Sequence, residues 1–179
     1  MMDKTVLESI VREVLDKSLE GRVLDKNQSP ASDLLTAANG GLVRTSISLA
    51  QAVDLIGKIE AKAAEGNMRV VAAVSDASGR PVAVHCMDGA YMGSYDVALN
   101  KTYTSIAFQM STAELGELSQ PGKSLYGIQF TNEGKIVIFG GGVVLTRKGV
   151  IVGALGVSGG SARQDTELAA YGKKIFEAS

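Results

Sequence analysis

Residues 70–110, VVAAVSDASGRPVAVHCMDGAYMGSYDVALNKTYTSIAFQM, predict a strand, a turn, a second strand, a loop and a helix. The apolar run over residues 70–74 is rich in β-branched side chains, as is typical of a buried strand. Residues 76–79 carry turn-forming side chains and end in a glycine. Residues 81–85 then return as a second strand, so the pair is expected to form a hairpin.

A helix is expected after the hairpin. Ser94 predicts its N-cap, and the helix is expected over residues 95–110. Side chains that recur at helical spacing predict one face that packs on the hairpin. The residues of this face are Tyr95, Ala98, Leu99, Thr102, Ile106 and Met110.

Length and composition indicate one globular domain with an additional tail. The chain has 179 residues, of which 45% are hydrophobic and 21% are charged. The net charge of −1 gives no electrostatic case for binding nucleic acid or an anionic membrane. No run approaches the roughly 20 apolar residues of a membrane span. The single cysteine, Cys86, cannot form an intramolecular disulfide, which fits a reducing cytoplasm.

Residues 1–20 differ in pattern from the rest of the chain. Their aliphatic side chains recur every three or four residues between charged ones, which predicts an amphipathic helix but not a signal peptide. Residues 21–44 are polar and rich in turn formers, so they are expected to form a linker. An isolated helix of this length is marginal in water and is expected to fold on a partner. The aliphatic stripe is Val6, Leu7, Ile10, Val11, Val14, Leu15 and Leu19.

Residues 45–179 predict a complete domain. Ser48 with Gln51, and Ser161 with Gln164, have the spacing of capping boxes that begin helices. The order of helices and hairpin-linked strands predicts an α+β fold with a mainly antiparallel sheet. Besides the hairpin and its helix, we expect a helix from Ser48 to about Glu65, a short helix from Ser111 or Thr112 to Gln120, strands at 135–139, 143–146 and 150–157, and a helix ending near Glu177.

The end of the second strand gathers side chains that can bind a ligand. His85 is the only histidine, so a zinc site of several histidines is excluded. His85, Cys86 and Met87 are three candidate haem-iron ligands in a row. Alternation along a strand places His85 and Met87 on one face and Cys86 on the other. The alternative is that His85 is a hydrogen-bonded surface residue and Cys86 a small buried one.

Charged and glycine residues around this strand offer two interpretations each. Asp88 and Gly89 form either a turn or the wall of a polar pocket. Lys101 either binds a carboxylate or phosphate of a ligand or forms a salt bridge with Asp88 or Asp96. The glycine-rich segments do not match a nucleotide-binding loop and favour close approach of neighbouring strands or helices.

Met87-Asp88-Gly89-Ala90, followed by Ser94, Lys101 and Thr104, resembles the core motif of the GlcG/HbpS family. This family is also called haem-degrading or DUF336, and it includes the C-terminal domain of PduO proteins. The resemblance covers about residues 45–176, although Cys86 stands where the family usually has arginine. It extends to Ser48-Leu49-Ala50-Gln51-Ala52, Gly140-Gly141-Gly142-Val143, and GALGVSGG at 153–160 followed by Gln164-Asp165.

The resemblance implies a profilin-like, five-stranded antiparallel sheet flanked by helices, assembled as dimers or larger oligomers. It also implies binding of a tetrapyrrole, with haem favoured over a corrinoid. His85 is the candidate iron ligand. The candidate cofactor-binding residues are His85, Cys86, Met87, Asp88, Gly89, Lys101, Thr104 and Gly141.

Residues 1–20 and their linker resemble the encapsulation peptides of bacterial microcompartment cargo proteins. This implies a shell protein as partner and a cytoplasmic location inside a microcompartment. The alternative is that the helix packs on its own domain or on a neighbouring subunit. For the whole protein, two other hypotheses remain beside tetrapyrrole binding. One is a small enzyme acting on an aldehyde, diol or hydroxy acid, with Lys101 and Asp88 in its site, and the other is a non-catalytic assembly protein.

Overall fold

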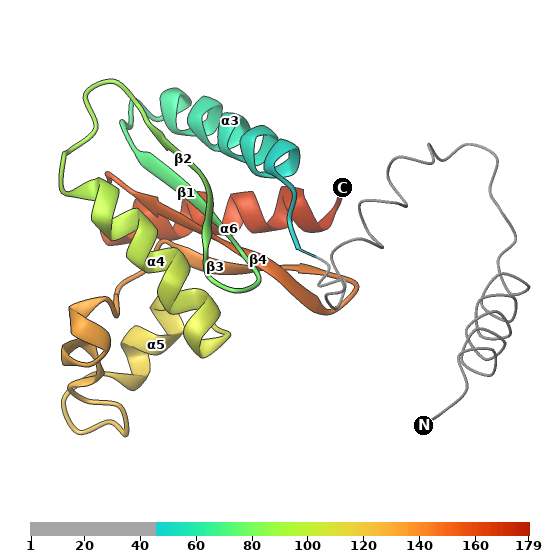
Figure 1. Cartoon of the computed structure of the whole chain (residues 1–179). Helices are drawn as coiled ribbons and strands as arrows, with labels where there is room; N and C mark the ends of the chain where they lie inside the picture. Colours follow the sequence, from blue (N-terminus) through green and yellow to red (C-terminus); the bar gives the residue numbers. More distant parts are fainter. Residues whose placement is uncertain (1–45) are drawn as a thin grey trace, which may run out of the picture. The chain divides into compact units, whose positions relative to one another are not determined.

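The computed structural model describes residues 46–179, which fold around a four-stranded antiparallel sheet (Figure 1). The helix expected over residues 1–20 and the linker expected over 21–44 lie outside the described residues. In chain order, the elements are α3 (Leu49–Glu65), β1 (Val71–Asp76), β2 (Pro81–Cys86), α4 (Ser94–Phe108), α5 (Thr112–Leu118), the 3-10 turns η1 (Ile128–Phe130) and η2 (Asn132–Gly134), β3 (Gly142–Arg147), β4 (Val150–Ser158) and α6 (Ala162–Glu177).

The sheet is made of two hairpins placed side by side. Its strand order is β2-β1-β4-β3, and every neighbouring pair is antiparallel. The α+β class and the antiparallel sheet are therefore confirmed. The expectation of five strands is wrong, because the described residues form four.

The segment expected as another strand, residues 135–139, packs against helices instead. The backbone N–H of Val137 donates a hydrogen bond to the hydroxyl of Thr104 in α4, at 3.0 Å. Gly116 of α5 lies so close to the carbonyl group of Ile138 that a side chain at this position would overlap it. The hydroxyl of Thr104 thus accepts the N–H of Val137 that would otherwise pair with a neighbouring strand. The apolar character of residues 135–139 does not indicate this contact.

Helices cover both faces of the sheet (Figure 1). The larger core lies between the sheet and α3 with α6, where Ile56 and Ile59 of α3 meet Leu155 of β4. On the other face, α4 packs on the sheet through a smaller cluster of Val71, Ala73 and Ala98.

Helix α4 approaches the sheet closely because both surfaces carry small residues. A Cβ atom at Gly156 of β4 would overlap the carbonyl oxygen of Ala98. The apolar face expected for this helix is only partly correct: Ala98 and Thr102 are buried, whereas Tyr95 is 46% exposed. The buried face of α4 consists of Ser94, Ala98, Lys101, Thr102, Thr104 and Ser105.

Local sequence signals locate the starts of α3, α5 and α6 correctly and that of α4 approximately. Both capping boxes are present, with Ser48 and Gln51 at the start of α3 and Ser161 and Gln164 at the start of α6. Ser94 is not the N-cap of α4, because that position is taken by Gly93. The Ser94 side chain is buried and bonded to Ser158 instead.

Candidate functional site

The end of β2 presents its three candidate ligands on alternating faces. His85 lies opposite Ala72, whose side chain belongs to the core under α3 and α6. Cys86 lies opposite Val71, whose side chain faces α4, and Cys86 is exposed. Met87 packs against the core on the α3 side. His85 and Cys86 therefore cannot bind the same iron atom from one side.

His85 is oriented by a carboxylate. Its Nδ1 lies 3.1 Å from Oε1 of Glu60 in α3, and the ring is partly exposed. If Nδ1 carries the proton and donates it to Glu60, Nε2 is the nitrogen left for a ligand. Metal-binding histidines are commonly held in this way by a carboxylate. Within residues 46–179, no group of three histidine, cysteine or acidic side chains could form a metal site of its own.

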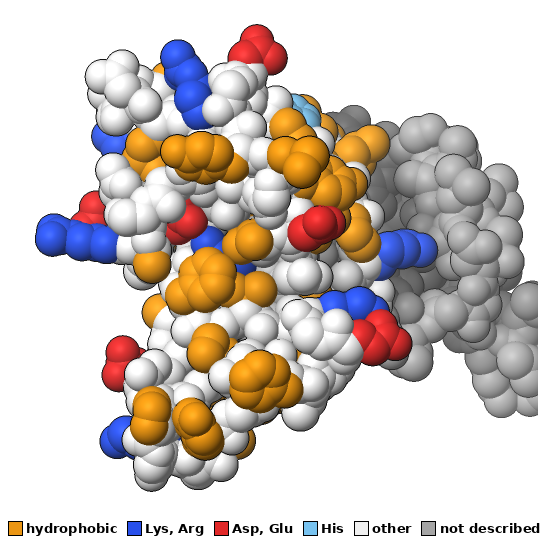
Figure 2. All heavy atoms as spheres, turned by 90° about the vertical axis from the view of Figure 1, so that its left-hand side faces the viewer, with side chains coloured by type: hydrophobic (Ala, Val, Ile, Leu, Met, Phe, Trp, Pro, Cys, Tyr) orange, Lys and Arg blue, Asp and Glu red, His pale blue; other side chains and the backbone are white. Residues whose placement is uncertain are grey.

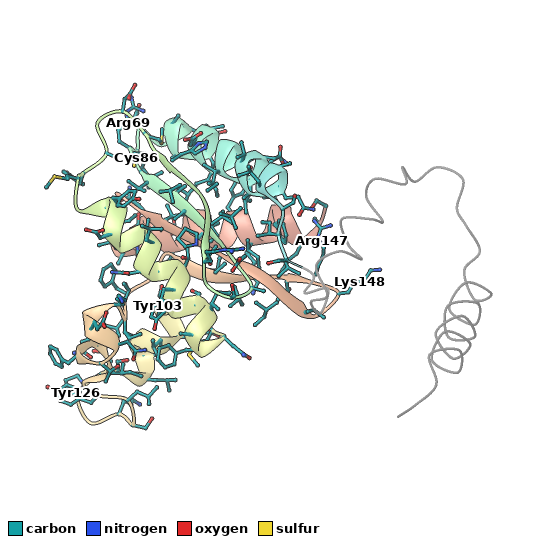
Figure 3. All side chains as sticks on the ribbon, viewed as in Figure 1. Arg69, Cys86, Tyr103, Tyr126, Arg147 and Lys148 are labelled. Atoms are coloured by element: carbon teal, nitrogen blue, oxygen red, sulfur yellow. The ribbon has the colours of Figure 1, made fainter. Side chains whose placement is uncertain are left out.

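The turn after β2 brings Arg69 next to the motif. Gly89 has φ +83°, and a Cβ atom there would lie 3.8 Å from Cγ of Arg69. Arg69 and Cys86 are near each other in Figure 3, at one end of the sheet. Arg69, which is exposed, was not among the residues expected from the sequence. Its position just before β1, close to Asp88 in the hairpin register, is the signal that could have identified it.

Exposed apolar side chains follow this turn into α4. Met92 is 94% exposed and Tyr91 is 75% exposed. Tyr95 adds a third large side chain that is partly open to solvent. Figure 2 shows hydrophobic side chains scattered over the face of the molecule that includes this region. This surface is apolar and can pack against a flat hydrophobic group.

Lys101 is not at the surface. Its side chain is 0% exposed, and its ammonium group donates to Oδ2 of Asp165 at 2.9 Å and to the carbonyl oxygen of Val157 at 2.6 Å. The ring centre of Phe139 lies 5.1 Å from the same nitrogen, within the range of a cation–π contact. The salt-bridge interpretation of Lys101 therefore describes this structure, but the partner is Asp165 and not Asp88 or Asp96.

The surroundings of this ion pair are closely packed. Burial lowers the pKa of Lys101 below its usual value, while the hydrogen bond and charge of Asp165 act in the opposite direction. The second carboxylate oxygen of Asp165 accepts the N–H of Gly160 at 2.9 Å. A Cβ atom at Gly141, which has φ +111°, would lie 2.5 Å from the Lys101 nitrogen. The ion pair thus joins both glycine-rich segments to α4.

Thr104 also has an internal role in this structure. Its hydroxyl donates to the carbonyl oxygen of Asn100 at 2.7 Å and accepts the N–H of Val137. The structure therefore divides the expected site residues into two groups. The residues His85 to Gly89 lie at the end of β2, whereas Lys101, Thr104 and Gly141 are buried.

A separate surface cavity of about 160 Å³ contains none of the expected site residues. It is lined by residues of α3, of the loop before β1 and of α6: Lys62, Met68, Gln164, Glu167, Leu168 and Tyr171. Among residues 46–179, no helix has the length and apolar character needed to cross a membrane.

The fold and the motif together define an HbpS-like α+β domain. The model of the family "Haem degrading protein HbpS-like" matches residues 47–174, and the chain belongs to this family. An uncharacterized 15.0 kDa protein from the dhaT-dhaS intergenic region of Citrobacter freundii is 45% identical over 124 residues, which cover 69% of this chain and 87% of that protein.

The corrinoid adenosyltransferase PduO of Salmonella typhimurium is 41% identical over 100 residues. These residues cover 56% of this chain but only 30% of PduO. The chain therefore corresponds to less than a third of that enzyme's length.

Solved structures that share the fold include two that are more than 30% identical to this chain. Protein ORFY of Klebsiella pneumoniae, from the DUF336 family, has a TM-score of 0.73 and is 35% identical, covering 88% of this chain and 99% of ORFY. A PduOC–haem complex has a TM-score of 0.69 and is 34% identical, covering 72% of this chain and 94% of PduOC.

Proposed function

We propose that this protein binds a tetrapyrrole, with haem favoured over a corrinoid, and acts as an accessory protein in a bacterial microcompartment. The observation that carries the proposal is the contact between His85 and Glu60, which leaves one ring nitrogen of a partly exposed histidine for iron. The 34% identity to PduOC, whose structure contains haem, supports the same ligand class.

The other side chains near the end of β2 fit the chemistry of a haem group. The exposed Tyr91 and Met92 offer apolar surface to a macrocycle, and Arg69 offers a guanidinium for a propionate. The sulfur atoms of Cys86 and Met87 are alternative iron ligands, and we favour them less than His85. Because Cys86 faces α4 and His85 faces α3, each residue predicts haem on a different side of β2.

Haem titration followed by absorption spectroscopy tests the proposal. The full chain is expected to give a saturable Soret band, and His85→Ala is expected to shift the band or abolish it. Arg69→Ala should weaken binding, whereas Lys148→Asn removes an exposed cation in the distant β3–β4 turn and should not (Figure 3). If the spectrum changes with Cys86→Ser but not with His85→Ala, the iron ligand is Cys86 and the haem lies on the α4 side of β2. The absence of a saturable Soret band contradicts haem binding.

The structure does not favour the alternative of a small enzyme, because the two residues proposed for its site, Lys101 and Asp88, lie apart. Lys101 is bonded to Asp165 inside the domain, while Asp88 is exposed in the turn after β2. The described residues therefore do not bring these two side chains together as one accessible site. Turnover of an aldehyde, diol or hydroxy acid without haem would favour the enzyme hypothesis over ours.

We further propose that residues 1–20 bind a microcompartment shell protein. Their stripe of aliphatic residues and the polar linker over 21–44 support this assignment. The 41% identity to PduO over part of the chain is consistent with such a setting. A cytoplasmic location inside the microcompartment follows from the same proposal.

A further inference from the structure

Strand β2 lies at one edge of the sheet and directs part of its backbone away from it. The N–H of Met87 donates to the carbonyl oxygen of the opposite residue, Val70, at 3.0 Å. In an antiparallel pair, hydrogen-bonded residues alternate with residues whose backbone groups point outward. The register therefore directs the N–H and C=O groups of Val84 and Cys86 away from β1.

The opposite edge of the sheet supports this reasoning. Just before β3, the carbonyl oxygen of Gly141 accepts a hydrogen bond from the N–H of Val157. Gly142, the first residue of β3, points its N–H outward to the hydroxyl of Thr112 at 2.9 Å. No comparable partner occurs within residues 46–179 for the outward backbone groups of Val84 and Cys86. The outer edge of β2 is thus open in the described part of the chain.

This edge has little of the protection that prevents strand pairing. Exposed edges usually carry charged residues, above all lysine, or an irregularity. Residues 81–86 contain no lysine, arginine, aspartate or glutamate, and the one proline, Pro81, stands at the first position of β2, outside the segment 83–86. The one irregularity lies opposite the Val74–Ser75 step, at the beginning of β2, so residues 83–86 keep a regular register.

We propose that β2 pairs with β2 of a second copy of this chain, antiparallel and around a two-fold axis at His85. An antiparallel strand edge is complementary to itself under such an axis. With this register, Val84 faces Cys86 of the partner copy, and Cys86 faces the partner's Val84. The two outward N–H groups on each strand then find carbonyl acceptors, and the two four-stranded sheets become one continuous sheet.

A second copy fits this edge because its complementarity lies in the backbone and in apolar side chains. Helix α4 packs on β4, β1 and β3, leaving the Val84 side chain only partly buried and Cys86 exposed. The same strand from another copy supplies matching apolar groups at Val84 and Cys86, and it brings the His85 side chains of the two copies together at the axis. The pairing rests on the backbone of β2 and does not require a bound tetrapyrrole, but it places the proposed iron ligand at the interface.

Oligomeric state is the first test, measured by light scattering on the full chain at about 50 µM. We expect a dimer or a multiple of it. Val84→Pro should at least halve the measured mass while preserving the circular dichroism spectrum, because proline is tolerated on an edge where the missing N–H pointed outward. Cys86→Ser keeps the backbone bond and should retain the wild-type mass.

Cross-linking tests the register even if Val84→Pro fails to fold. The double variant Val84→Cys, Cys86→Ser, co-expressed with the wild type, should give a disulfide-linked heterodimer with native Cys86 after mild oxidation. The expected Cα separation of about 5.5 Å suits a disulfide. The control Ala83→Cys, Cys86→Ser places its thiol on the other face and should not cross-link. A monomeric wild type, a cross-link restricted to the double variant alone, or equal cross-linking of the control overturns the proposal.

Discussion

Replacing Asp165 by asparagine is expected to destabilise the domain by about 3 kcal/mol. Lys101 is 0% exposed and would keep its ammonium group inside the protein without a counter-charge. Removing one member of a buried ion pair typically costs about 3–5 kcal/mol. The lower end applies here because the asparagine oxygen can still accept a hydrogen bond, and Val157 still accepts one from Lys101.

Urea denaturation at pH 7 measures this loss. Glu167→Gln is the matched control on the same helix, because Glu167 pairs with Arg163 at the surface, where the two side chains are 62% and 88% exposed. This control should change stability by less than about 0.5 kcal/mol. The double variant Lys101→Met, Asp165→Leu should recover much of the loss, since no unpaired charge remains buried. A loss below about 1 kcal/mol in Asp165→Asn would refute the reasoning.

The stability deficit of Asp165→Asn is also expected to change with pH in one direction. Burial already lowers the pKa of Lys101 in the folded protein, and Asp165 opposes that shift. Without Asp165, the folded pKa falls further below that of the unfolded chain. Between these two values the unfolded state binds more protons, so the free energy of unfolding rises with pH. The deficit of Asp165→Asn should therefore be complete below the folded pKa and shrink toward pH 10, and a constant deficit would contradict this.

Two further predictions concern packing and the N-terminal segment. Gly156→Ala should lower the free energy of unfolding in urea by more than about 2 kcal/mol, because the new methyl group overlaps Ala98 of α4. The control Gly57→Ala in α3 has open space around it and should raise the free energy of unfolding by up to about 1 kcal/mol. Equal effects of the two substitutions would contradict the close approach of α4. Residues 1–20 fused to an unrelated protein should direct it into a microcompartment, Leu7→Asp or Leu15→Asp should abolish this by placing a carboxylate in the apolar stripe, and Lys17→Glu should not. Equal encapsulation of all three variants would contradict a role for the stripe.

Local signals explain which parts of the fold the sequence predicts well. The β1–β2 hairpin follows from an apolar run and a glycine turn, and Ser48 with Gln51 marks the start of α3 by a contact three residues apart. Such features depend on neighbours in the chain. The sheet order also follows the hairpins, apart from the direct contact between β1 and β4.

Longer-range contacts explain the errors. The partner of Lys101 is 64 residues away in the sequence, so spacing favoured nearer acids. Hydrophobicity predicts that Tyr95 lies on the inward face of α4, whereas the close approach at Gly156 leaves room there only for small and polar side chains. The hydroxyl of Thr104 similarly captures Val137 from a segment with the composition of a strand.

The candidate site residues therefore fall into two groups, one that stabilises the fold and one that is accessible to a ligand. Three of these residues, Lys101, Thr104 and Gly141, are packed inside the domain. Lys101 joins α4 to Asp165 at the start of α6 and lies next to Gly141, while Thr104 joins α4 to the segment before β3. Substitutions there are expected to act through stability, and a loss of ligand binding would not locate the ligand. His85 and Arg69 are accessible and belong to no buried ion pair among residues 46–179. A ligand assay is thus informative when it compares variants of these two residues at unchanged melting temperature, because only there can binding be separated from folding.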